Sequence, residues 1–454
     1  MNIQLGWISL VLSPLALGYQ PAVVEPRSGS EPSAYAIAFG GSPGEDTLVS
    51  SATDREGNFY LLGDTRSPRF PVSEDAIQKD RSGQSDLFVT KVDANGFLVY
   101  STLHGGRGNE LASALAVDVE GNVYVAASTT ADFYQSRGST GRFVLFRFSP
   151  GAKNLDYVYD FEPGLAGTIR AIAVPPGGGL IFAGESATLT LRTTERVFQP
   201  RPAGLREGFI GKLNAAGTSL VFLSYLGGSA EEQLRGIAVD SAGNIAVTGH
   251  TYSADFPTTA GAVQSAIHPG ACSGATCPDA FLSIIHPSGT TLSYSTYLGG
   301  AGVDYAQSVA FAGYSTVLLT GFTLSHDFPV TEKAWQTTHS RFGSDAFIAK
   351  IDTEASKLVF STYLGAGEGI TGGDDEALSI AVDSSGRGVV AGRTRSQNFP
   401  QSAPVQTGRG EILNPDGTAQ RCRQPGAALL QPCWDGFVAV ISESGDRLLH
   451  STFL

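Results

Sequence analysis

Short hydrophobic runs alternate with polar turn residues along most of the chain. The runs are rich in Val, Ile, Phe, Tyr and Thr, and Gly, Asn, Asp and Pro bound them, which is typical of β-strands. No window of the sequence keeps its apolar residues at the 3.6-residue spacing of an amphipathic helix. The pattern therefore predicts an all-β protein.

The runs return in groups of four and in a fixed order. The first run ends in Asp, as in 236–240 (GIAVD), and the second follows at once, as in 244–249 (NIAVTG). A longer loop with Phe-Pro leads to the third run, as in 345–350 (DAFIAK), and the fourth follows, as in 358–364 (LVFSTYL). The group recurs every roughly 60–70 residues, which is longer than the ~40–50 residues of common propeller repeats.

Each group of four runs predicts one small antiparallel sheet. Gly-Asn pairs between the first two runs, as at 121–122 and 243–244, supply the positive φ angles of a tight hairpin. A four-stranded sheet cannot bury both of its faces alone, but a ring of such sheets can. The sequence therefore predicts a β-propeller, and we expect aromatic residues to fill the space between its sheets: Phe281, Phe347, Phe360 and Tyr363.

Four motifs carry a resemblance to a known family. They are IAVDSAGNIAVTGHT at 237–251, DFPTT at 255–259, DAFIAK at 345–350 and LSYSTYLGG at 292–300. Together they resemble the bacterial seven-bladed β-propeller (SBBP) repeat family over roughly residues 35–454. The resemblance implies a propeller of the kind found on exported bacterial proteins, and it brings no catalytic residues.

The repeat count predicts six blades, and seven is the alternative that the family name suggests. The repeats cover about 39–103, 104–163, 164–226, 227–298, 299–364 and 365–454. The third repeat is degenerate, because residues 176–179 (PGGG) replace its Gly-Asn turn. We expect an N-terminal strand at Tyr35–Phe39 and the C-terminal strand ending at Leu454 to close the ring.

The N-terminus has features of a secretory signal. Residues 5–12 (LGWISLVL) are apolar, and small residues precede a cleavage position after Gly18. We therefore expect a signal peptide at 1–18, a linker at 19–34 and the propeller at 35–454, with the protein secreted, periplasmic or on the cell surface. No Lys or Arg precedes the apolar run, so an N-terminal strand or a wrongly assigned start is the alternative. No second apolar stretch is long enough to predict a membrane span.

Composition and net charge restrict the kinds of partner that the protein is expected to bind. The chain has 454 residues, 42% of them hydrophobic and 16% charged, which excludes an intrinsically disordered protein. The net charge of −13 argues against a nucleic-acid partner, because phosphate binding needs a basic face. We therefore expect the ligand to be a protein or a glycan. We also expect the chain to be a monomer.

The four cysteines predict two local disulfides, Cys272–Cys277 and Cys422–Cys433. A four-thiolate zinc site is the alternative. The two pairs lie in different repeats and neither has the C-x2-C spacing of a zinc knuckle, which disfavours zinc.

Acidic residues mark the loops between one repeat and the next. We expect them to gather on one face and to form a candidate ligand site: Glu45, Asp46, Glu110, Glu231, Glu232 and Asp304. Asp374, Asp375 and Glu376 are the candidate metal ligands, because calcium favours several carboxylate oxygens, and calcium is the one cofactor considered. A solvated charged loop is the alternative for both sets.

Residues that recur in every repeat are interpreted as structural. Asp at the end of the first run and Asp before the third run fit turns and caps better than paired catalytic carboxylates. The histidines do not form an H-E-x-x-H motif. His250 and His326 are candidates for a binding face, with ordinary surface histidines as the alternative.

Three functions follow as hypotheses. The first is a non-catalytic binding or scaffold propeller at the bacterial cell exterior. The second is a carbohydrate-active or other hydrolytic or lyase enzyme that uses carboxylates on the face of the long loops. The third is a calcium-stabilised structural module of the cell surface.

Overall fold

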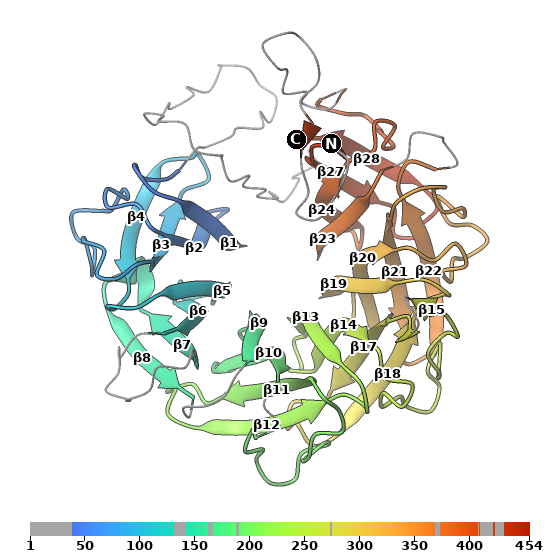
Figure 1. Cartoon of the computed structure of the whole chain (residues 1–454), viewed down its shortest axis with the longest axis horizontal. Coiled ribbons are helices and arrows are strands. Elements are labelled where there is room, and N and C mark those ends of the chain that lie inside the picture. The colour runs from blue at the N-terminus through green and yellow to red at the C-terminus, as the bar shows by residue number, and fades with distance from the viewer. Residues whose placement is uncertain are drawn as a thin grey trace. The chain divides into compact units, whose positions relative to one another are not determined.

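Six four-stranded antiparallel sheets are arranged as a β-propeller in the computed structural model of the chain (Figure 1). The structure describes residues 39–130, 142–161, 167–187, 190–272, 275–367, 373–406, 408, 421–422 and 431–454. One short 3-10 turn, Pro150–Ala152, is the only helical element among these residues. The predictions of an all-β propeller and of six blades are confirmed.

The described residues divide into two compact units. The N-terminal unit lies within Ser9–Arg201 and Gly208–Tyr225, and holds three sheets, each hydrogen-bonded in chain order. Their strands are β1 (Asp46–Thr53), β2 (Phe59–Thr65), β3 (Asp86–Val92) and β4 (Leu98–His104); β5 (Glu110–Val117), β6 (Val123–Thr129), β7 (Arg142–Phe148) and β8 (Leu155–Asp160); and β9 (Gly167–Ala173), β10 (Leu180–Ser186), β11 (Glu207–Leu213) and β12 (Leu220–Leu226).

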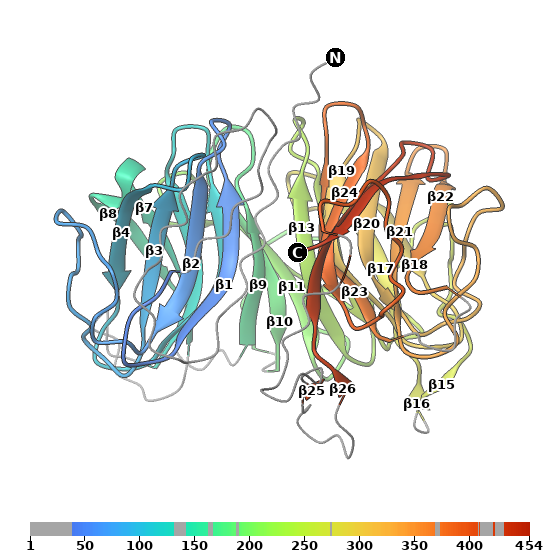
Figure 2. The same ribbon diagram turned by 90° about the horizontal axis from the view of Figure 1, so that it is seen from above.

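The C-terminal unit contains Pro202–Glu207 and Leu226–Leu454 and holds the other three sheets. Their strands are β13 (Glu232–Val239), β14 (Ile245–Thr251), β17 (Asp279–Ile285) and β18 (Leu292–Leu298); β19 (Asp304–Phe311), β20 (Thr316–Thr323), β21 (Asp345–Asp352) and β22 (Lys357–Leu364); and β23 (Asp375–Val382), β24 (Gly388–Thr394), β27 (Asp435–Ile441) and β28 (Leu448–Phe453). Two short hairpins, β15 (Ala271–Cys272) with β16 (Ala275–Thr276) and β25 (Arg421–Cys422) with β26 (Gln431–Pro432), project from the same side of this unit (Figure 2).

A single aspartate builds the hairpin between the first two strands of a blade. Asp240 Oδ1 accepts the N–H groups of Ala242 at 2.9 Å and Asn244 at 2.8 Å, while its Oδ2 accepts from Asn244 Nδ2 at 2.7 Å. Gly243 takes the positive φ of 87° that the turn requires. The backbone bonds recur at Asp54, Asp118 and Asp383, which supports a structural role for this repeated residue.

The first strands join neighbouring sheets within each unit. In the N-terminal unit β5 contacts both β1 and β9, and in the C-terminal unit β19 contacts both β13 and β23. Every first strand carries a register shift against its partner, for example between Ala306 and Ser308. Beside this shift, Ser308 Oγ accepts a hydrogen bond at 3.2 Å from the N–H of Ile380 in the next sheet.

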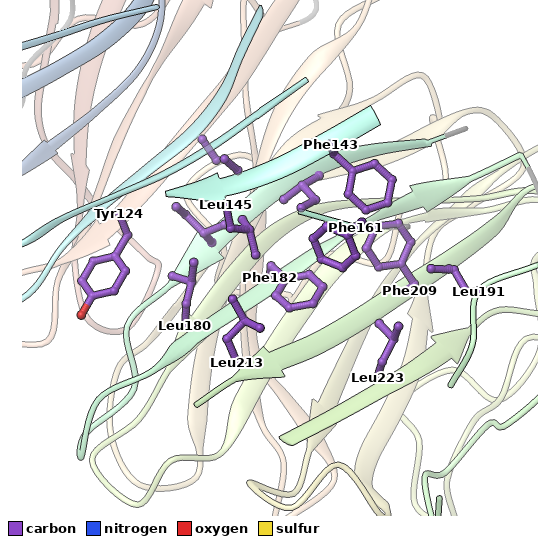
Figure 3. Close-up of a cluster of buried hydrophobic side chains, with 14 of the residues drawn as sticks. Tyr124, Phe143, Leu145, Phe161, Leu180, Phe182, Leu191, Phe209, Leu213 and Leu223 are labelled. Carbon is purple, nitrogen blue, oxygen red and sulfur yellow. The ribbon is translucent and has the colours of Figure 1, made fainter. Parts of the chain in front are cut away.

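Large side chains fill the space between sheets. Figure 3 shows the cluster between the second and third sheets, where the rings of Phe143 and Phe161 lie 4.6 Å apart and those of Phe143 and Phe209 lie 5.6 Å apart. In the C-terminal unit all four aromatic residues that the sequence assigns to this role are buried: Phe281, Phe347, Phe360 and Tyr363. Within each unit, neighbouring sheets therefore cover one another's hydrophobic faces.

Several predictions about the chain ends fall outside the described residues. The signal peptide, the linker and most of the expected strand at Tyr35–Phe39 lie there, and they remain predictions. Phe39 is described, and its ring packs edge-on against Phe70 at 5.4 Å. A helix long and apolar enough to cross a membrane is absent from the part of the chain that the structure describes.

Loss of a ring from the cluster between sheets should destabilise the N-terminal unit. Phe182 is fully buried in that cluster, so we expect Phe182→Ala to lower the free energy of unfolding by about 3–5 kcal/mol. Phe97→Ala is the matched control, because that ring is 65% exposed. Urea unfolding of both variants would measure the difference, and equal losses would contradict the packing described here.

Candidate functional site

A buried carboxylate opens the first strand of most blades. Asp304 accepts hydrogen bonds from the hydroxyl groups of Thr323 and Ser325, the latter at 2.8 Å, and from the N–H of Gly300 at 2.8 Å. Asp375 and Glu232 are bound by a threonine and a serine in the same way. The threonine and the serine follow the carboxylate at the same sequence spacing in all three blades. The carboxylate therefore fixes the corner where the second strand ends.

A second carboxylate opens the third strand. Asp279 Oδ2 accepts from Gln264 Nε2 and from the N–H of His268, both at 2.8 Å. Asp345 Oδ2 is bound by Gln336 Nε2 at 3.2 Å and by the N–H of Ser340 at 2.8 Å. These bonds hold the end of the long loop against the sheet.

The two kinds of carboxylate meet at the seam between neighbouring blades, beside the glycine that follows the fourth strand. A Cβ atom on Gly299 would lie 2.6 Å from Asp279 Oδ1 and 2.8 Å from Asp304 Oδ2. Gly227 stands in this way between Glu207 and Glu232, and Gly365 between Asp345 and Asp375. Glycine is required here because the carboxylates occupy the space of a side chain.

Burial raises the pKa of these carboxyl groups. The pKa of Asp279 rises to about 7 and that of Asp304 to about 6, mainly because both are removed from water. Burial also raises the pKa of Glu232 to about 7 and that of Asp375 to about 7, and the neighbouring carboxylate adds to each shift. The seams therefore carry groups that titrate near neutral pH.

In each blade one cross-strand pair of residues differs in identity from the pair in the other blades, whereas the residues around it are constant. The constant residues on the second strand are a small residue before the pair (Gly63, Ala127, Gly184, Gly249, Gly321, Gly392) and a hydroxyl residue after it (Thr65, Thr129, Ser186, Thr251, Thr323, Thr394). We call the residues between them, with their first-strand partners, the variable pairs: Thr47–Asp64, Leu111–Ser128, Thr168–Glu185, Gln233–His250, Tyr305–Phe322 and Glu376–Arg393. The first-strand member of every pair remains exposed or half-buried.

Two variable pairs of the C-terminal unit form an aromatic cluster. The imidazole of His250 stacks on the ring of Tyr305 at 3.9 Å, and Phe322 meets the same ring edge-on at 5.2 Å. The hydroxyl groups of Tyr252 and Tyr305 lie 3.0 Å apart. We call His250, Tyr252, Tyr305 and Phe322 the tyrosine cluster; Arg235 lies close enough to lower the pKa of His250, although burial is the larger cause, and the two bring it to about 3.

Comparison with known families identifies the repeat. The family model described as a beta-propeller repeat, SBBP, matches residues 99–134 and 223–257. The chain carries SBBP β-propeller repeats. The second match runs from the fourth strand of one blade through the first two strands of the next, and it includes Glu232, the glycines beside it and His250.

The similarity to solved structures is weak. A Hadza microbial sialidase is 11% identical, with a TM-score of 0.39, over 76% of this chain and 63% of the sialidase chain. A Synechocystis apocarotenoid oxygenase mutant is 12% identical, with a TM-score of 0.40, over 89% of this chain and 71% of its own. A glucose dehydrogenase is 12% identical, with a TM-score of 0.39, over 77% and 94%. These values carry no information about activity, and a search of curated proteins found no match.

The structure separates the predicted ligand residues of the SBBP repeats into two groups. Glu110, Glu232 and Asp304 are buried in the corners described above, and Asp46 is bound there by Thr65 at 2.5 Å. Glu45 and Glu231 remain exposed, and Glu45 forms an ion pair with Arg66 at 3.1 Å. The ligand site at these residues remains a prediction.

The predicted metal ligands point in different directions. Asp375 is buried in its corner, whereas Asp374 forms an ion pair with Arg395 at 3.1 Å and Glu376 forms one with Arg393 at 2.6 Å. Groups of three or more His, Cys, Asp or Glu residues suited to a metal ion are absent among the described residues. Calcium binding at this loop remains an untested prediction.

One predicted disulfide is confirmed. Cys272 and Cys277 are joined across the β15–β16 hairpin. Cys433 is also disulfide-bonded. The side chain of its expected partner, Cys422, lies outside the described residues, although the backbone strands β25 and β26 bring that position to the same hairpin.

The sequence reasoning found His250 but misplaced it and missed its neighbours. His250 is buried, so the expectation of an ordinary surface histidine is wrong. His326 instead stacks near His339, with ring centroids 4.6 Å apart. Tyr252 and Tyr305 carried no motif. Alignment of the six repeats would have revealed His250 and Phe322 as changing residues between a constant glycine and a constant threonine, and Tyr305 is the strand partner of Phe322.

A methyl group at the seam should separate the two carboxylates. We expect Gly299→Ala to lower the free energy of unfolding by about 1–3 kcal/mol, because the added atom has no space beside Asp279 and Asp304. Gly408→Ala is the control, since a Cβ there meets nothing within 4 Å. Thermal unfolding of the two variants would compare them, and an unchanged Gly299→Ala protein would show that the seam can open.

Proposed function

We propose that the chain is a non-catalytic binding or scaffold module at the exterior of a bacterial cell. The export pattern at residues 5–18 supports the location, and the division of each repeat into constant and variable positions supports the role. The ligand would contact the variable pairs. Loops and rigid edges that present changing side chains are the common place for recognition on a repeated scaffold.

This proposal rests on the variable pairs, because packing and hydrogen bonding account for the recurring residues beside them. The carbonyl oxygen of Tyr305 sits against Gly321, where a side chain would clash, and the hydroxyl of Thr323 is used by Asp304. Packing and hydrogen bonding thus fix the glycine and the threonine. The residue between them is free to differ, and it changes from Asp64 to Phe322 without a change in strand pairing.

The tyrosine cluster has the chemistry of a contact surface. Tyrosine offers an apolar ring and a polar hydroxyl at a small cost in conformational entropy, which is why it is common at recognition sites. Tyr252, Tyr305 and Phe322 are all half-buried, so part of each ring faces solvent. Arg235, also half-buried, adds donors beside them, and this combination suits a sugar ring with its hydroxyl or acidic groups.

The enzyme alternative finds less support in these contacts. Glycoside hydrolysis needs two carboxyl groups that reach the substrate. Asp279 and Asp304 come close together, but both side chains are completely buried and bound by their own blades. The contacts of the seam carboxylates are those of structural groups.

A glycan-binding assay tests the proposed role. We expect calorimetry with peptidoglycan fragments and a panel of oligosaccharides to detect binding, and Tyr305→Ala to weaken it by about tenfold or more. Tyr305→Phe keeps the ring and should lose less. Tyr314→Ala, on the same blade and 79% exposed, is the control that should bind like the unmodified protein.

Two outcomes would contradict the proposal. Equal affinities of the Tyr305→Ala and Tyr314→Ala proteins would remove the tyrosine cluster from the contact surface. Turnover of any probe by the unmodified protein would show that the module is an enzyme.

A further inference from the structure

Two seams of the C-terminal unit each contain a carboxylate oxygen without a hydrogen-bond donor. Asp279 Oδ1 and Asp345 Oδ1 are buried and make no hydrogen bond, although the other oxygen of each group accepts two. Both unbonded oxygens point toward the first-strand aspartate of the next blade, across Gly299 and Gly365 respectively. A buried carboxylate oxygen with no donor is costly, so its position calls for an explanation.

Another carboxylate lies close to each unbonded oxygen. Asp279 Oδ1 and Asp304 Oδ2 both lie within 2.8 Å of the position that a Cβ of Gly299 would take, at 2.6 and 2.8 Å, so they cannot be more than 5.4 Å apart. Two negative charges at this separation repel strongly in a site without water. A proton on one carboxyl would remove one charge and supply the missing donor.

We propose that the first of these seams, Asp279–Asp304, holds one proton shared by its two aspartates, so that the fit between neighbouring blades depends on pH. This inference concerns the frame and is independent of the ligand proposed above. It is a property of the pair, since either carboxyl can carry the proton.

Other titratable groups face the first seam. Asp327 lies near both aspartates and raises the pKa of each, after the larger effect of burial. His268 gives its backbone N–H to Asp279, and its Nε2 lies 3.6 Å from Asp327 Oδ2. The phenol of Tyr297 also faces Asp279, and it donates to the carbonyl of Ser253 at 2.7 Å.

The direction of the pH effect follows from the raised pKa values. The folded protein keeps the shared proton of the Asp279–Asp304 pair up to about pH 6–7, whereas an unfolded aspartate releases its proton at about pH 4. The folded state therefore binds more protons between these values, and its stability falls as the pH rises through the folded pKa. The contribution is fully present below the unfolded pKa.

The test uses the full chain and its Asp279→Asn variant. We expect the melting temperature of the unmodified protein to fall by several degrees between about pH 5 and about pH 8, and the fall to shrink by at least half in the variant. An asparagine amide supplies the donor that the shared proton supplies. Infrared absorption of a protonated carboxyl near about pH 6 should likewise be present in the unmodified protein and reduced in the variant.

Asp86→Asn is the matched control in the other unit. Asp86 opens a third strand too, but both of its oxygens accept hydrogen bonds: Oδ1 from the N–H of Gly83 at 3.1 Å, and Oδ2 from Ser82 and Gln78. The asparagine amide would place its own N–H donor opposite another N–H donor. We therefore expect a lower melting temperature at both pH values.

Three results would overturn the proposal. The variant could lose stability at both pH values, as the Asp86→Asn protein should, which would show that the unbonded oxygen accepts bonds in solution. It could keep the full pH dependence of the unmodified protein. Added calcium could raise the melting temperature of the unmodified protein at about pH 8 but not that of the variant, which would place a metal ion in the seam instead of a proton.

Discussion

A buried carboxylate at the corner of most blades is the interaction on which much of this architecture depends. It takes two hydroxyl donors from the end of the second strand and a backbone N–H from the loop that arrives from the preceding blade, as Asp304 does. One side chain thus joins two strands of its own sheet to the neighbouring sheet. Hydrophobic packing holds the faces together without direction, whereas these bonds determine how the corners align.

The third blade shows what happens where the carboxylate is missing. Its first strand begins with Gly167 instead of an acid, and its sequence is also the most divergent of the six. An ion pair between a half-buried arginine and a buried glutamate stands within the same strand pair, with Arg170 Nη2 at 2.7 Å from Glu185 Oε1. Strand pairing and the aromatic cluster around Phe182 are kept. The blade therefore keeps its fold when a different polar interaction replaces the carboxylate.

Most of the fold could be predicted from the sequence because its signals are local and repeated. Asp240 with Gly243 specifies a turn within five residues, and the recurrence of four runs specifies the sheets. The candidate site could not be predicted in the same way. The meeting of Asp279 with Asp304 depends on how two blades pack, and the burial of His250 depends on Tyr305 from the next blade. Acidic residues such as Glu232 looked like surface groups because a sequence does not show which side of a corner is closed.

Every sheet in the described residues is built from strands that follow one another in the chain, including β23, β24, β27 and β28 in the last blade. A gene segment encoding one blade could therefore be copied or deleted without breaking a sheet. Two blades that become neighbours in this way would have to fit each other only at the seam. There the glycine, its two carboxylates and their hydroxyl donors form a small recurring set of contacts. Such a recurring set of contacts lets blade number change during evolution while each blade keeps its own variable pair.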